Sequence, residues 1–285
     1  METLLIRHEE LVEKISQKIV EANNIMREEI FRQLLSYEGP FCDVLRRNAE
    51  VAKTKGLPLC QDTGFIEFFI FTPFNAIFQR PVQESCDEAV MKVYSSRPYR
   101  HSVVSDPLYE RRNTRTNTPS ICHIFHWGEN RLQIRLLIKG GGSENLTTLF
   151  MLPPTADDEE LLERITEHVA RHGSKGCPPL RVGVGVGGSA DKAMLLSRLA
   201  LTYSLNEVNP DPRYELLERR ISEKLNQLRI GFQGLGVGPT VFSVHILQAP
   251  THIANLPVAV SFDCYLSRIG VMEVEPVRIE SRRKN

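Results

Sequence analysis

The sequence lacks an excess of charge of either sign, a long apolar run and a dense set of cysteines. Its 35 Lys and Arg residues balance 35 Asp and Glu residues in a chain of 285, so no bulk field attracts nucleic acid or an anionic membrane. The N-terminal segment is charged from Glu2 onward, unlike a secretory signal, and no run approaches the ~20 apolar residues that span a bilayer. We therefore expect a soluble protein of the cytoplasm that binds neither nucleic acid nor membrane.

The six cysteines are scattered, which is typical of reduced thiols and not of a disulfide framework. No C-x-x-C pair and no zinc-finger spacing is present. Cys60 and Cys177 lie in turns bounded by Pro and Gly, which can aim a thiolate, and Cys264 follows a predicted strand. From the residues alone, metal ligation by these three cysteines and burial as small apolar side chains both remain open. The other three are expected in the core, namely Cys42, Cys86 and Cys122.

Apolar periodicity predicts a mixture of helices and strands. Helices are expected over residues 9–35, 42–54, 83–96, 157–172, 189–205 and 213–228. Strands are expected over residues 65–71, 121–127, 131–139 and 180–186, and within 231–248 and 256–270. The short Gly-Glu-Asn connection predicts that the second and third of these strands pair as a β-hairpin.

No repeat or linker divides the chain, so we expect one large α+β domain over residues 1–285. Its N-terminal part, residues 1–55, is helical, and residues 56–285 form a β-sheet flanked by helices. Residues 97–120, rich in turn formers and arginine, are expected to form a long ordered loop, a kind of segment that often carries function.

Two glycine clusters follow predicted strands. Gly183, Gly185 and Gly188 satisfy G-x-G-x-x-G between a strand and a helix, but the only later carboxylate at suitable spacing, Glu207, is in no strand. A tight turn is therefore favoured over an anion site or a dinucleotide site. The second cluster, Gly140 to Gly142 in "KGGGSEN", exceeds the needs of an ordinary turn and predicts a close approach of backbone to ligand.

The acid–base candidates are Asp62, His101, Asp106 and His252. Asp62 stands two residues after Cys60, and each of the four is on its own equally consistent with a capping or hydrogen-bonded structural role. Arg100 opens the basic loop and is either a solvated charge or a bidentate clamp for a carboxylate.

Several of these segments, taken in order, resemble the class I, iron–sulfur-dependent fumarases and L(+)-tartrate dehydratases, in their alpha subunit or N-terminal catalytic domain. They are "CQDTG", "RHSVVSDPL" with "RNTRTNTPS", "KGGGSEN", "GCPPLRVGVGVGGSADKA", "GFQGLG" and "APTHIANLPVAVSFDC". The likeness covers residues 50–270 and implies the α+β fold of that domain.

The resemblance implies a 4Fe-4S cluster held by the thiolates of Cys60, Cys177 and Cys264, with one iron open as a Lewis acid. Residues 56–285 would then be the cluster-binding part. Asp62 matches the catalytic acid/base, and His252 is expected to hydrogen-bond and tune it.

The substrate contacts of the family match Gln61, Arg100 and the glycines Gly140, Gly141 and Gly142. One departure stands out, because Val237 interrupts the glycines of "GLGVGPT" and is expected to narrow or displace the turn near Thr240.

The implied reaction is the reversible hydration that links a 2-hydroxydicarboxylate to its dehydrated partner, either malate with fumarate or tartrate with oxaloacetate. In the family the catalytic base comes from a beta subunit or a C-terminal domain, so the resemblance implies a hydro-lyase alpha subunit in an α2β2 assembly. Two alternatives remain: an iron–sulfur sensor without turnover, and a dinucleotide-binding oxidoreductase.

Overall fold

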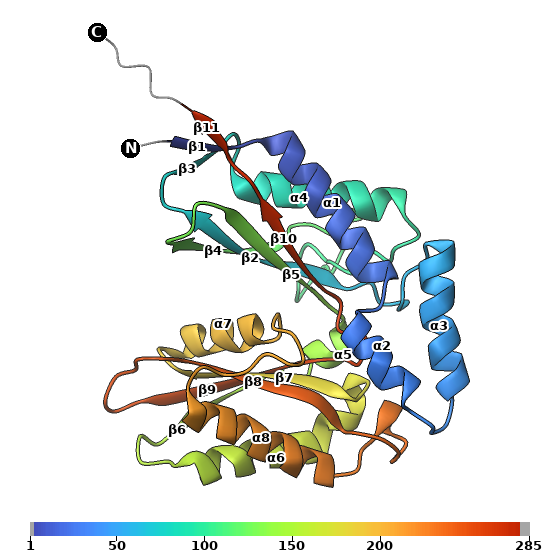
Figure 1. The fold of residues 1–285 in the computed structure, drawn as a ribbon, viewed down its shortest axis with the longest axis vertical. Helices are drawn as coiled ribbons and strands as arrows, with labels where there is room; N and C mark the ends of the chain where they lie inside the picture. The colour runs from blue at the N-terminus through green and yellow to red at the C-terminus, as the bar shows by residue number, and fades with distance from the viewer. Residues whose placement is uncertain (1–2, 280–285) are drawn as a thin grey trace. The chain divides into compact units, whose positions relative to one another are not determined.

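The computed structural model describes residues 3–279, and their contacts group the chain into two compact units (Figure 1). The first unit combines residues up to 26, residues 49–139 and residues from 268, and the second combines residues 27–48 and 140–267. The predicted α+β class is confirmed. The helical opening predicted over residues 1–55 contributes to both units, and the assignment of the whole chain to one iron–sulfur domain stays a prediction.

The first unit is built on a four-stranded sheet of order β10-β5-β2-β4. Its strands are β2 (Phe65–Pro73), β4 (Ile121–Trp127), β5 (Leu132–Lys139) and β10 (Ile269–Val274). Strand β2 pairs parallel with β4 and antiparallel with β5, so the predicted β-hairpin between β4 and β5 is wrong. The almost wholly apolar β2 is buried from Ile66 to Ile70 and takes the central position, whereas β4 alternates in exposure and suits an edge.

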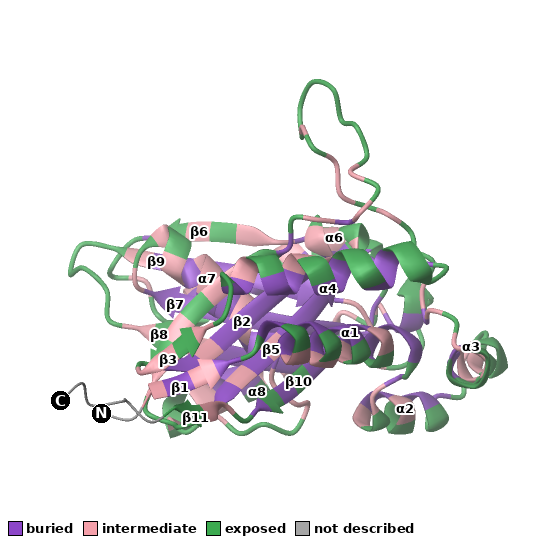
Figure 2. Ribbon diagram, turned by 90° about the horizontal axis from the view of Figure 1, so that it is seen from above, coloured by how far each residue is buried: buried purple, intermediate pink, exposed green. Residues whose placement is uncertain are grey.

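Two helices cover one face of this sheet, α1 (His8–Asn24) and α4 (Val82–Ser96). Each carries a stripe of buried residues and an exposed outer side (Figure 2). The core between helices and sheet includes Ile15, Ile19, Val90, Phe68 and Ile134. A small sheet of order β11-β1-β3 completes the unit, with strands β1 (Thr3–Ile6), β3 (Ala76–Phe78) and β11 (Val277–Ile279). Helix α3 (Cys42–Lys55) belongs to the first unit from residue 49 onward.

The second unit has a sheet of order β6-β9-β7-β8 between helices. Its strands are β6 (Thr148–Leu152), β7 (Leu180–Gly187), β8 (Val241–Ala249) and β9 (Leu256–Asp263). Helices α6 (Asp158–His172) and α8 (Pro212–Gln227) pack on one face, and α7 (Ala190–Ala200) lies on the other (Figure 1). The shorter elements are α2 (Glu28–Leu35), α5 (Gly141–Glu144), η1 (Gly173–Gly176) and η2 (Phe232–Gly234).

The glycines of the G-x-G-x-x-G series are required by packing. A Cβ on Gly183 would lie 2.1 Å from the Ser197 carbonyl oxygen, and one on Gly185 would lie 1.9 Å from that of Ala193. Helix α7 therefore lies directly against the backbone of β7, and Gly188 turns the chain with φ +71°. This geometry supports the tight-turn interpretation and accounts for the series without a nucleotide.

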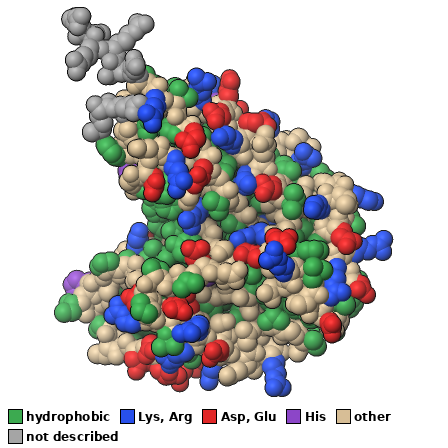
Figure 3. Space-filling model, in the orientation of Figure 1, with side chains coloured by type: hydrophobic (Ala, Val, Ile, Leu, Met, Phe, Trp, Pro, Cys, Tyr) green, Lys and Arg blue, Asp and Glu red, His purple; other side chains and the backbone are tan. Residues whose placement is uncertain are grey.

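Figure 3 shows acidic and basic side chains interspersed over the face in view, as the balanced composition predicts. Among residues 3–279, no helix combines the length and the apolar character that a bilayer crossing requires.

Strand β8 is an edge strand, and side chains pair its main chain at Ile246 and at its start. The Glu218 Oε1 accepts the N–H of Ile246 at 2.6 Å, and Asn209 Nδ2 donates to the Ile246 carbonyl at 2.9 Å. Farther along α8, Asn226 Oδ1 accepts the N–H of Thr240 at 2.7 Å. Helix α8 thus closes an edge that would otherwise be open to pairing with another strand.

We expect Glu218→Leu to lower the free energy of unfolding by about 1–3 kcal/mol, because the buried Ile246 N–H loses its acceptor. Glu218→Gln keeps a side-chain oxygen for that N–H and removes a buried charge, so it should be at least as stable as the wild type at pH 7. Urea unfolding of the three proteins measures both effects.

The pH dependence of the same comparison has a definite sign. Burial raises the pKa of Glu218 above its ordinary value of 4.5, so folding favours the protonated carboxyl and the ionised form costs stability at neutral pH. The advantage of Glu218→Gln should shrink as the pH falls through the raised pKa and vanish below 4.5. A Gln variant that is less stable than the wild type at pH 7 would contradict this account.

Candidate functional site

The turn between α3 and β2 carries Cys60, Gln61 and Asp62. Two hydrogen bonds hold it. Before the turn, the Leu59 N–H donates to the Asn23 carbonyl at 2.8 Å, and after it the Gly64 N–H donates to Asp62 Oδ1 at 3.0 Å. Cys60 and Asp62 are half-buried and Gln61 is exposed. The backbone is therefore held while these three side chains lie at the surface of the first unit.

A pair of hydrogen bonds joins this turn to the loop of Arg100. Thr63 Oγ1 accepts the Arg100 N–H at 2.9 Å and donates to the Arg100 carbonyl at 3.0 Å. Arg100 is exposed, whereas Thr63 is fully buried. The first unit thus brings Asp62 and Arg100 into neighbouring positions.

Two other candidates of the long loop have structural partners. His101 Nε2 is 3.0 Å from the carbonyl oxygen of Tyr94. Asp106 Oδ1 accepts the N–H groups of Leu108, Tyr109 and Glu110, and these backbone hydrogen bonds, that of Tyr109 above all, hold the pKa of Asp106 below its usual range. His101 and Asp106 are accounted for as loop-stabilising residues.

In the second unit Cys177 and Cys264 lie beside each other. Cys177 follows η1 in the left-handed conformation, with φ 56°, and is exposed. Cys264 follows the last residue of β9 and is half-buried. The N–H of Tyr265 donates to the Cys177 carbonyl at 3.1 Å, so cysteines far apart in the sequence meet at one end of the inner strands β7 and β9.

The glycine turn lies at the same end of the strands. Helix α5 begins at Gly141 and packs against η1 and β9. A Cβ on Gly142 would lie 3.5 Å from the Lys175 carbonyl, an ordinary contact, and Gly140 to Gly142 are all outside the positive-φ region. A positive φ therefore does not account for these glycines. Glu144, at the end of the turn, forms a bidentate ion pair with Arg198.

A buried arginine that the sequence analysis missed supports the Cys264 turn. Arg181 is fully buried and donates to Ser267 Oγ at 2.7 Å, to Ser243 Oγ at 3.3 Å and to the Tyr203 carbonyl. Burial lowers the pKa of Arg181 to about 10, so its guanidinium remains charged at neutral pH. A single charge inside the apolar strand "LRVGVGVG" was the signal that could have found it.

His252 lies at the other end of the sheet from the two cysteines. It is exposed in the β8–β9 loop, which Thr251 ties to the Gly188 carbonyl at 2.8 Å, beyond the end of β7. Strand β9, of 8 residues, separates this loop from Cys264. At about 3.3 Å per residue the strand spans roughly 26 Å. In Figure 1 the β8–β9 loop and α5 mark the opposite ends of these strands.

Thiol ligation of a cluster agrees with the donors present. None of the six cysteines, all within the described residues, forms a disulfide. Cys177 and Cys264 are adjacent in the second unit, and Cys60 belongs to the first. Across residues 3–279, no three His, Cys, Asp or Glu side chains gather closely enough to hold a metal ion. The structure therefore brings together two of the three predicted ligands.

Val237 lies in the turn that it was expected to narrow, and its side chain points outward. Its side chain is 43% exposed, and its carbonyl accepts the N–H of Phe232 at 2.8 Å. Thr240 is fully buried, and its Oγ1 accepts the N–H of Ile230 at 3.0 Å. Thr240 is thus held by a buried hydrogen bond, and an effect of Val237 on this turn stays a prediction.

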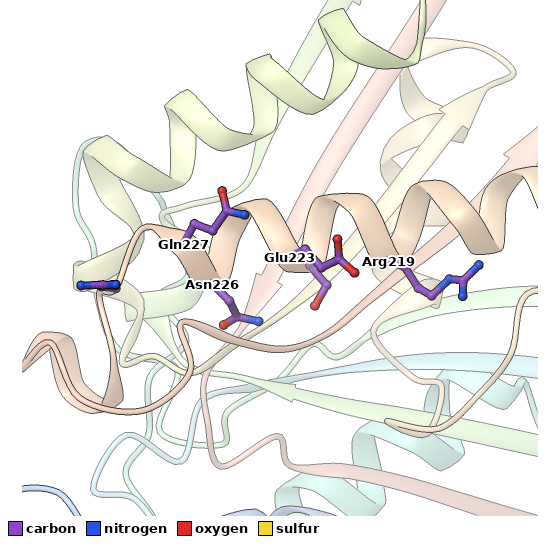
Figure 4. A pocket seen from close by; sticks show the side chains of 6 residues that line it. Arg219, Glu223, Asn226 and Gln227 are labelled. Carbon is purple, nitrogen blue, oxygen red and sulfur yellow. The ribbon is translucent and has the colours of Figure 1, made fainter.

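One surface pocket lies along α8 and is lined by Arg219, Glu223, Asn226 and Gln227 among others (Figure 4). It includes none of the predicted site residues, and Asn226 is already engaged with the end of β8. We do not count this pocket as part of the site.

Comparison with known proteins identifies the family of the chain. Residues 10–273 match the family model described as fumarate hydratase (Fumerase). A Methanocaldococcus jannaschii protein provisionally named L(+)-tartrate dehydratase subunit alpha is 35% identical over 233 residues, which cover 80% of this chain and 82% of the relative. The L(+)-tartrate dehydratase alpha subunits of Escherichia coli and Shigella sonnei are each 32% identical over 235 residues, covering 80% of this chain and 76% of theirs. The chain belongs to the fumarate hydratase (Fumerase) family and is a hydro-lyase.

Proposed function

We propose that this chain is the alpha subunit of an iron–sulfur-dependent hydro-lyase that acts on a small 2-hydroxydicarboxylate. The substrate pair is tartrate with oxaloacetate, or malate with fumarate, and the names of the relatives favour tartrate. Those names also support a separate beta subunit. We propose that it supplies the rest of the site and that the assembly is α2β2. We assign the enzyme to the cytoplasm.

One observation carries the proposal. Cys177, Cys264 and the glycine turn, which are far apart in the sequence, converge at one edge of the second unit. Folding alone does not require two cysteines at the ends of these strands, beside a series of glycines none of which has a positive φ. A thiolate-bound group next to a backbone open to a ligand accounts for both.

The 4Fe-4S cluster would be held by Cys60, Cys177 and Cys264. When bound, it supplies a Lewis-acidic iron for a carboxylate and a hydroxyl of the substrate. Two of the remaining cysteines do not suit this role, since Cys86 is fully buried in the apolar core and Cys122 packs against the same core. The third, Cys42, was expected in the core but is half-buried at the start of α3.

The chain's own residues bind and orient the substrate and move a proton. Arg100, exposed on a fixed loop, pairs in bidentate fashion with a substrate carboxylate. Gln61 adds an amide donor, and the N–H groups of Gly140 to Gly142 approach the substrate closely. Asp62 gives a proton to the departing hydroxyl group, which leaves as water, and takes a proton from water in the reverse reaction.

The position of His252 supports a site shared between two copies of the chain. The eight residues of β9 separate His252 from Cys264, so His252 cannot reach a group bound at the Cys264 end of the strands. Our proposal is that His252 tunes Asp62 of a second copy of the chain. The two alpha chains of the assembly would then be needed for catalysis.

The cluster is tested by reconstitution with iron and sulfide under anaerobic conditions. We expect the wild type to show a four-iron chromophore, and Cys60→Ser, Cys177→Ser and Cys264→Ser each to lose it because a thiolate ligand is gone. Visible absorption and iron quantitation give the result. Cys42→Ser, which changes a thiol on α3, is the control and should keep the chromophore. A wild-type protein that takes up no iron would end the proposal, and a cluster without turnover in the presence of any beta subunit would favour a sensor.

Asp62 is tested by Asp62→Asn. The amide keeps an Oδ1 acceptor for the Gly64 N–H and so preserves the turn, but it cannot exchange the proton. We expect kcat to fall by about 10²–10⁴-fold with KM little changed. Asp106→Asn is the matched control, because Asp106 also accepts backbone N–H groups and should leave kcat near that of the wild type. Equal losses in the two variants would remove Asp62 from the mechanism.

The sharing of His252 is tested by complementation. Asp62→Asn and His252→Asn chains, carrying different tags, are co-expressed with the beta subunit, and the mixed assembly is purified through both tags. One site of this assembly has both native residues, so activity should exceed that of either variant alone. Asp62→Asn mixed with Arg100→Ala should recover nothing, because the two residues lie in the same unit of one chain. No recovery with His252→Asn would refute the shared site.

A further inference from the structure

The loop that bears Arg100 is held by side chains and not by pairing of strands. Residues 97–120 form no helix and no ladder beyond the single bridge between Val104 and Asn113. Without such a ladder, the position of the Arg100 guanidinium relative to the Asp62 carboxylate depends on the few groups that join the loop to the turn at residues 60–64.

Thr63 joins the turn directly to the main chain of Arg100. Its single hydroxyl uses both its acceptor and its donor capacity on one residue, with Arg100 N at 2.9 Å and Arg100 O at 3.0 Å. Thr63 is fully buried, and it follows Asp62 directly in the chain. Any displacement of this hydroxyl therefore moves the two surface residues relative to each other.

Two further side chains hold the turn from the other side. Tyr94 Oη donates to the Thr63 carbonyl at 2.6 Å. Asn117 Nδ2 donates to the Gly64 carbonyl at 2.9 Å while its Oδ1 accepts the Ser102 N–H at 2.8 Å. Burial raises the pKa of Tyr94 well above its ordinary value, so this hydroxyl remains a donor at every working pH.

We propose that Thr63, supported by Tyr94 and Asn117, is a positioning residue that holds Asp62 and Arg100 in the register needed for catalysis. The inference rests on the proposed function, because it assigns Thr63 a role only if these two residues act on the substrate. Thr63 itself touches no substrate. It acts through the main chain of Arg100 and through its covalent neighbour Asp62.

The test compares Thr63→Val with Thr63→Ser. Valine keeps the branched shape and loses both hydrogen bonds, whereas serine keeps the hydroxyl. We expect Thr63→Val to lower kcat/KM by about 100-fold, since a shift on the order of 1 Å in a catalytic group has that effect, and Thr63→Ser to restore most of it. Thr72→Val is the control, because Thr72 is a buried threonine near the other end of β2 whose hydroxyl donates to the Pro73 carbonyl.

Two measurements separate positioning from a purely structural role. Hydrogen exchange of the peptide that contains Arg100 should quicken in Thr63→Val and not in Thr63→Ser, whatever the activity. In the Arg100→Ala background, Thr63→Val should cost less than in the wild type, because the part of its effect that passes through the Arg100 guanidinium is already lost.

The outcomes distinguish this inference from the proposed function. Faster exchange with unchanged kcat/KM, unchanged exchange, or additive losses in the double variant would each overturn the positioning role while the hydro-lyase stands. A wild type that neither binds nor converts any 2-hydroxydicarboxylate would overturn the proposed function, and the positioning role with it.

Discussion

The second unit depends on one buried charge. Arg181 has no exposed surface, and its guanidinium is satisfied by Ser243 on β8, by Ser267 in the turn after Cys264 and by the Tyr203 carbonyl after α7. A charge taken out of water is tolerated only when its donors are paired, so these segments are bound to one geometry. The Cys264 turn is thereby held by the buried guanidinium, which also binds the Tyr203 carbonyl three residues after the end of α7 at Ala200.

The sequence predicted best where one physical requirement dominates. The helix over residues 42–54 and the strand over 65–71 are confirmed within two residues, because amphipathic or continuous apolar patterns decide them. The helix over residues 157–172 begins one residue later, behind Asp157, which caps it by accepting the Glu160 N–H at 2.9 Å. Strand order was beyond such patterns, since β4 and β5 are joined by a short connection and yet are separated by β2. The three-residue strands β3 and β11 carry too little periodicity to be recognised.

The candidate site was predicted as a set of residues and not as an arrangement. "CQDTG" and "KGGGSEN" are recognisable as local sequences, but the Thr63–Arg100 hydrogen bonds and the contact of Tyr265 with Cys177 join segments distant in the chain. His252 shows the limit most clearly. The resemblance placed it at the site of Asp62, whereas the eight residues of β9 separate its loop from Cys264. Spacing in a sequence translates into distance only once the intervening element is known.

Both units fix residues of the candidate site in the same way, through the main chain. The Arg100 backbone is bound by the Thr63 hydroxyl, and the Cys177 carbonyl is bound by the Tyr265 N–H. A residue that is anchored through its own side chain cannot use that side chain for binding or catalysis. A residue that is anchored through its backbone keeps its side chain available for either. The groups that hold the loops, Thr63 and Arg181 among them, are buried, and Arg100 and Cys177 are exposed above them. Because the anchoring groups are separate from the exposed side chains, loop segments can hold those side chains in fixed positions.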